Sequence, residues 1–74
     1  MAKNSSSITA LPPATQVKLE DLGRRIMLAR KRRGLTLHEM AKLMLVSVGS
    51  LQRLEAGTPG TSIGTLVTAL LTLG

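Results

Sequence analysis

Apolar side chains recur three and four positions apart over most of the chain, a spacing that predicts helices. The first helix is expected from about Thr15 to Arg33, with Gly34 as a left-handed stop after it. Its apolar stripe consists of Leu19, Leu22, Ile26 and Ala29. Three shorter helices with the same kind of pattern follow, so the chain is predicted to be all-α.

The second helix has the clearest start signal. Thr36 is the expected N-cap, and Glu39 three positions later can bond back to it in a capping box. Leu35 before the cap and Met40 after it are spaced as a hydrophobic staple. The buried stripe is predicted to be Leu37, Met40, Ala41 and Met44. This helix should end after about two turns.

A break of roughly three residues around Leu45 and Val46 should join the second helix to a third one. Ser47 is the expected cap of the third helix and Gly57 its end. Its apolar face consists of Val48, Leu51 and Leu54. Small Ala41 would let the two helices cross closely, and Val46 would fill the gap between them. The pair therefore has the pattern of two short helices joined by a tight turn.

The segment AGTPG at 56–60 is a loop by composition, and Ser62 is the expected cap of a fourth helix. The stripe of this last helix is predicted to be Ile63, Leu66, Val67, Leu70 and Leu71. Residues 1–14 combine Ser, Asn and a Pro-Pro pair, which is typical of a disordered or flexible N-terminal arm. We therefore expect one folded domain over residues 15–74.

The chain is strongly basic, with ten Lys and Arg against four acids and a net charge of +6. Six of the ten cations lie within residues 24–33. Such an excess predicts a polyanionic partner, either nucleic acid or an anionic membrane. The absence of Phe, Tyr and Trp argues against binding single strands by stacking on aromatic side chains.

Other classes of function find little support in the residues. There is no Cys, so disulfides and Cys-containing zinc sites are excluded. His38 is the only histidine, so we expect no enzyme, no cofactor and no metal site. Residues 1–15 have no signal-peptide core, and the apolar stretch Ile63–Leu73 is too short to span a bilayer. We expect a cytoplasmic protein with no membrane partner.

Three segments together resemble the Cro/C1-type (XRE) helix-turn-helix proteins. They are LGRRIMLARKRRGLTLHEMAK (22–42), VSVGSLQRLEAG (46–57) and SIGTLVTALLTLG (62–74). The run from Arg30 to Thr36 and the ending from Leu54 to Gly57 carry most of the specificity. The resemblance spans about residues 19–74, and the segment PGTSIGTLVTALLTLG is similar to the HipB-like antitoxin branch.

The resemblance implies a lambda-repressor-like bundle of four to five short helices whose third helix, 47–56, lies in the major groove of DNA. The base-reading positions carry over to Val48, Gly49, Gln52 and Arg53. Gln52 would pair with adenine, Arg53 with guanine, and Val48 would touch a thymine methyl group.

The expected phosphate contacts are the helix starts at Thr36, Leu37 and Ser47, with Arg32, Arg33 and Lys42. The resemblance also pairs Arg30 with Glu55 as an internal salt bridge. Two positions depart from the family, which often has Gly at Leu45 and a phosphate-binding Gln at Leu37.

These observations predict a sequence-specific regulator that binds double-stranded DNA, most simply a dimeric repressor. Four residues that fall partly outside the stripes, Met27, Leu28, Leu43 and Leu45, suggest an exposed patch for self-association or part of a wider core. Two alternatives remain open. One is an antitoxin that caps a toxin and represses its own operon, and the other is a protein-binding adaptor that does not bind DNA.

Overall fold

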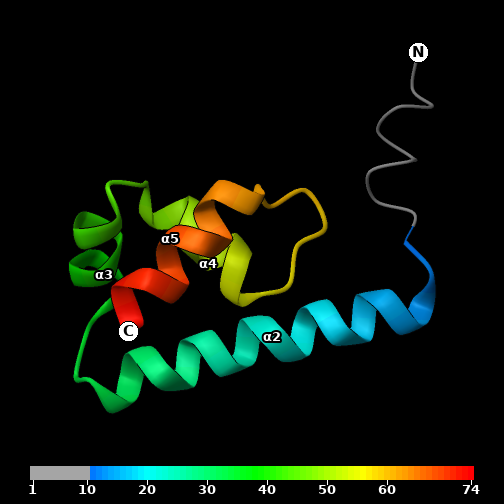
Figure 1. Cartoon of the computed structure of the whole chain (residues 1–74), viewed down its shortest axis with the longest axis horizontal. Coiled ribbons are helices and arrows are strands. Elements are labelled where there is room, and N and C mark those ends of the chain that lie inside the picture. Colours follow the sequence, from blue (N-terminus) through cyan, green and yellow to red (C-terminus); the bar gives the residue numbers. More distant parts are fainter. Residues whose placement is uncertain (1–10) are drawn as a thin grey trace.

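Four helices make up the computed structural model, which describes residues 11–74 (Figure 1). They are α2 (Pro13–Arg32), α3 (Leu37–Met44), α4 (Val48–Glu55) and α5 (Ile63–Leu73). Residues 11–74 contain no strand, so the predicted all-α fold is confirmed. The expected N-terminal arm lies, for residues 1–10, outside the described part of the chain.

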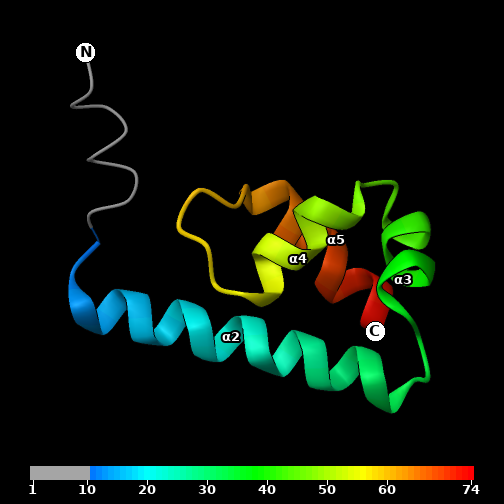
Figure 2. The same cartoon turned by 180° about the vertical axis from the view of Figure 1, so that it is seen from behind.

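Helix α2 begins at Pro13, two residues before the expected start, and ends at Arg32. Proline suits the first turn of a helix because its missing N–H needs no partner there. Gly34, with φ of 68°, then reverses the chain into α3. The other three helices pack along one side of α2, which Figures 1 and 2 show from front and back. Within residues 11–74, no helix is long and apolar enough to cross a membrane.

The core is aliphatic and draws on all four helices. Met40 and Leu51, at its centre, have no exposed surface. The complete set of buried apolar residues is Ile26, Met40, Ala41, Met44, Leu51, Leu54, Ala69 and Leu73. The predicted stripes of α2, α3 and α4 all contribute to this cluster or pack against its edge.

The predicted stripe of α5 is largely wrong. Of its five residues only Leu66 packs against the core; Ile63, Val67, Leu70 and Leu71 are exposed. The buried face is instead the one that carries Ala69 and Leu73. Because seven of the eleven residues of α5 are apolar and none is charged, periodicity alone did not identify the buried face, and the face with the small Ala69 allows the closer approach.

Two glycines allow α2 and the end of α4 to meet backbone to backbone. A Cβ atom at Gly23 would lie 2.5 Å from the carbonyl oxygen of Glu55. On the other side of the contact, a Cβ atom at Gly57 would lie 2.6 Å from the Cα atom of Glu20. Gly57 also has a φ of 74°, which disfavours any residue with a Cβ atom. The position of α4 on α2 is therefore set by this contact.

Candidate nucleic-acid interface

The start of α3 is fixed by the capping box that its sequence predicts. The Glu39 amide donates to the Thr36 hydroxyl at 3.1 Å, and the Thr36 amide donates to Glu39 Oε1 at 2.8 Å. The bond from the Thr36 amide, and after it that from the Thr36 hydroxyl, lowers the pKa of the Glu39 carboxyl from its usual value. Thr36 itself is exposed, and the first amides of an α-helix have no partner within the helix, which is the arrangement that a phosphate contact requires.

The turn between α3 and α4 is built on a left-handed leucine. Leu45 has φ of 59° and ψ of 40°, and its side chain is 91% exposed. The amides of Leu45 and Val46 donate to the carbonyls of Lys42 and Ala41 at 3.2 and 3.1 Å, which is a Schellman ending. Val46 packs against the core between the helices, in the place that the sequence predicts for it.

Helix α4 begins with a second side-chain cap. The Ser47 hydroxyl oxygen accepts from the Ser50 amide at 3.0 Å, and Ser47 itself is exposed. Leu51 and Leu54 are buried beneath the helix, whereas Gln52 and Arg53 are exposed on its other side. Helix α4 therefore packs against α3 on one side and presents a polar face to solvent on the other.

The predicted base-reading residues lie on one side of α4, but not all to the same extent. Val48 and Gly49 are half-buried, with Val48 packed against the core. Arg53 curls back over the first turn, where its Nη2 atom donates to the Ser50 hydroxyl at 3.4 Å. Its guanidinium also borders a polar hollow between α4 and α5 that Ser50, Gly60, Thr61, Ser62 and Thr65 complete.

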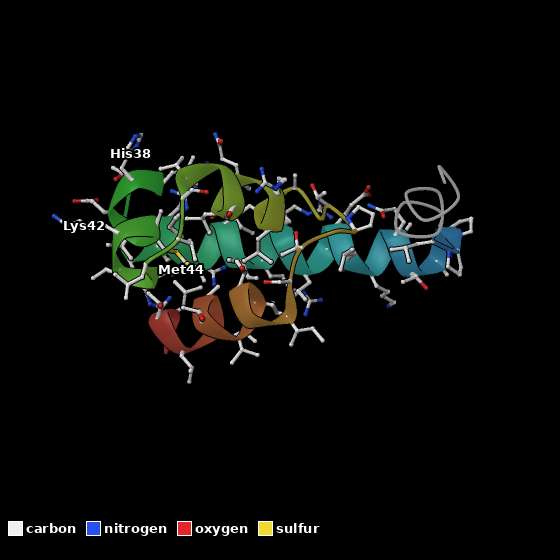
Figure 3. All side chains as sticks on the ribbon, turned by 90° about the horizontal axis from the view of Figure 1, so that it is seen from above. His38, Lys42 and Met44 are labelled. Atoms are coloured by element: carbon white, nitrogen blue, oxygen red, sulfur yellow. The ribbon has the colours of Figure 1, made fainter. Side chains whose placement is uncertain are left out.

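The predicted phosphate-binding residues divide into three groups. Thr36 and Ser47 are exposed and cap the two helices, whose first amides have no partner within the helix. Arg32, Arg33 and Lys42 are exposed cations; Figure 3 shows Lys42 and His38 pointing away from the bundle, while Met44 turns inward. Leu37 packs against the core, so only its backbone is available.

Arg30 and Glu55 face each other across the bundle. Arg30 Nε and Nη2 donate to the two carboxylate oxygens of Glu55 at 2.8 and 3.1 Å, and both side chains are 8% exposed. Arg30 Nη1 also donates to the carbonyl of Leu35 at 2.9 Å. One guanidinium thus links α2 to the end of α4 and to the segment that leads into α3, so it acts within the fold and does not face outward.

Two features were missed by the sequence reasoning. One is the polar hollow beside Arg53, whose signal was the Ser62 cap placed soon after α4. The other is the exposed apolar face of α5, which the sequence analysis assigned to the core. Among residues 11–74, no group of three or more His, Cys, Asp or Glu is placed to hold a metal ion.

Comparison with known proteins agrees with this geometry. A family model described as a helix-turn-helix domain matches residues 21–74, which is well over half of the chain. No curated protein and no solved structure matches the chain. The matched segment contains α3, the left-handed turn at Leu45 and α4. The chain belongs to the helix-turn-helix domain family.

Proposed function

We propose that this protein is a sequence-specific regulator of transcription of the Cro/C1 type, a cytoplasmic repressor that binds double-stranded DNA as a dimer. The observation that carries the proposal is α4: its buried Leu51 and Leu54 hold Gln52 and Arg53 outward. A helix of this kind, propped on a second helix, fits the major groove. The proposal is of a binding module and involves no catalysis.

Charge supports the same partner. Arg30 is neutralised by Glu55, and Arg24 and Arg25 lie near Asp21 at 2.9 and 3.9 Å. Further exposed cations remain at the end of α2, on α3 and on α4, at Lys31, Arg32, Arg33, Lys42 and Arg53. Cations of this kind attract the phosphate backbone and make binding strongly dependent on salt.

Selection of bound duplexes from a random pool tests the proposal directly. We expect enrichment of a short motif that recurs as two inverted half-sites one helical turn apart. The wild-type protein is then titrated against the selected duplex and a scrambled one over a series of salt concentrations. Recovery of no motif, with equal affinity for both duplexes, would contradict the proposal.

The roles of the α4 residues are separated by three variants. Gln52→Ala should relax the preference at one position and cost roughly 1–3 kcal/mol on the selected duplex only. Arg53→Ala reports base reading if it does the same, and phosphate binding if it weakens all duplexes alike and lowers the salt slope by about one. Arg25→Ala, which removes the same charge from α2, is the matched control and should leave the sequence preference unchanged.

An antitoxin is the second candidate. It is favoured by the similarity of residues 59–74 to the HipB-like branch and by the exposed apolar face of α5, which a partner protein could cover. Co-purification with the product of a neighbouring gene, together with loss of that product's toxicity, would support it. A protein-binding adaptor is the third candidate, and it predicts no affinity for any duplex even at low salt.

A further inference from the structure

An apolar pocket lies where the middle of α2 meets the segment between α4 and α5. Its volume is about 140 Å³. Its walls include leucines of three helices, Leu19 and Leu22 of α2, Leu54 of α4 and Leu66 of α5, with part of the segment 57–62 on the remaining side. This segment belongs to the wide loop that runs beside α2 in Figures 1 and 2. An apolar cavity of about 150 Å³ admits benzene, so the pocket has room for a molecule of that size.

The lining of the pocket carries no charge. Among the described residues that line it there is no Lys, Arg, His, Asp or Glu, although the chain has a net charge of +6. A charged ligand would lose its hydration there without gaining a partner of opposite charge, which costs free energy. The lining therefore favours a neutral and largely apolar ligand.

One polar atom at the pocket lacks a hydrogen bond. The Thr61 hydroxyl is buried without a partner, and it is the only side-chain atom within residues 11–74 of which this is true. Ser62, which also lines the pocket, differs because its hydroxyl accepts from the Thr65 amide at 3.1 Å and so caps α5. An unpaired buried hydroxyl destabilises a fold, and a ligand with one hydrogen-bonding group would remove that cost.

The segment 58–62 controls access to this hydroxyl. Because the Thr61 oxygen is covered from solvent, a ligand reaches it only when residues 58–62 shift slightly. These residues belong to no helix, whereas the wall on the α2 side is fixed by the close backbone contact of Gly23 with the Glu55 carbonyl. The segment 58–62 is therefore the wall that adjusts to a ligand.

We propose that this pocket binds a small neutral molecule, with an apolar body about the size of one aromatic ring and a single hydroxyl or carbonyl group, and that the Thr61 hydroxyl is its hydrogen-bond partner. Thr61 and Ser62 also line the polar hollow beside Arg53, so the two sites share a wall. A ligand that shifts this wall alters the surroundings of Arg53 and acts as an effector of DNA binding; this second step rests on the proposed function.

Titration of the full chain with benzyl alcohol, followed through its amide resonances by NMR, tests the site. We expect saturation with a dissociation constant on the order of 1 mM, because so small a ligand makes few contacts. The amides of Gly23, Leu54 and Thr61 should shift together, while those of α3, which does not line the pocket, should not. Shifts that fail to saturate, or that spread evenly over all four helices, would overturn the proposal.

Two probes and two variants isolate the part played by Thr61. Thr61→Val keeps the shape of the side chain, and it should fold at least as stably as the wild type because the lost hydroxyl has no partner. It should weaken benzyl alcohol roughly 3- to 10-fold and leave the binding of toluene, the same ring without a hydroxyl, unchanged.

Thr68→Val is the matched control for Thr61→Val. The Thr68 hydroxyl donates to the Gly64 carbonyl at 2.8 Å, and Thr68 does not line the pocket. This variant should therefore bind benzyl alcohol and toluene as the wild type does. Equal losses of benzyl alcohol binding in the two variants would contradict the role of Thr61.

The effector step is measured by adding saturating benzyl alcohol to the complex with the selected duplex. The affinity for the duplex should fall several-fold, and the duplex should weaken the probe by the same factor, because coupling between two sites is reciprocal. Unchanged affinity for the duplex refutes this step. A chain that selects a DNA motif but binds no probe refutes the pocket and leaves the proposed function intact, and a chain that binds the probe but no duplex does the reverse.

Discussion

Replacing Leu45 by glycine should stabilise the protein, although it removes a large apolar side chain. The left-handed conformation costs a residue with a Cβ atom about 1–2 kcal/mol, which glycine does not incur. Glycine returns about 0.5–1 kcal/mol of this through the greater freedom of its unfolded chain. Because Leu45 is 91% exposed, little packing is lost. The net gain should be about 0.5–1 kcal/mol.

Urea unfolding followed by far-UV circular dichroism measures this change, because a chain without Trp or Tyr offers no intrinsic fluorescence. We expect Leu45→Gly to raise the midpoint without changing the slope, and to raise the melting temperature by roughly 2–8 °C. Leu45→Ala is the matched control: it removes the same exposed side chain but keeps the Cβ atom, so its midpoint should stay near that of the wild type. A glycine variant no more stable than the alanine variant would refute the reasoning about strain.

Three further changes probe the groups that hold α3 and α4 in place. Glu55→Gln should lower the free energy of unfolding by roughly 3–5 kcal/mol because it leaves Arg30 charged, buried and unpaired. In the same urea titrations, the double variant Arg30→Met, Glu55→Leu should lose much less stability than the sum of the losses in Arg30→Met alone and Glu55→Leu alone. Gly23→Ala should lower the melting temperature by several degrees in scanning calorimetry, because the added Cβ atom would clash with the Glu55 carbonyl. An unchanged melting temperature would show that α2 and α4 can move apart at no cost. Glu39→Gln should make the stability of the protein less sensitive to acid, because the pKa of the Glu39 carboxyl is lowered in the folded state. The stabilisation from this carboxylate is complete above the ordinary glutamate pKa of about 4.3 and is lost as the pH falls from there through the lower pKa of the folded state. The urea midpoints of wild type and variant should therefore converge toward low pH, and parallel curves would contradict the role of the capping box.

Local signals predicted the central part of the fold well, because they act over three or four residues. The capping box at Thr36 and the serine cap at Ser47 correctly predicted from the sequence where α3 and α4 begin. The beginning of α2 was misplaced by two residues because Pro13 fits equally well in a loop and in the first turn of a helix.

Features that depend on distant residues were harder to predict. The partner of Arg30 lies 25 positions away, and no local pattern connects the two; only the family resemblance suggested Glu55. On α5, seven of the eleven residues are apolar and none is charged, so periodicity did not distinguish the face that packs against the other helices from the face that is exposed. The helix itself was predicted correctly, but the residues predicted to be buried were mostly the wrong ones.

Gly23 of α2 lies against the end of α4, and Gly57, just after α4, lies against α2, so backbone atoms in direct contact set the angle between the two helices. Side chains between helices can rotate to absorb a change in volume, but main-chain atoms in direct contact cannot. A methyl group added there would act as a wedge at the carboxyl end of α4 and swing its amino end, which carries Ser47 and the first amides. Gly23 and Gly57, neither of which is a predicted DNA contact, thereby influence the angle at which Gln52 would meet DNA under the proposed function.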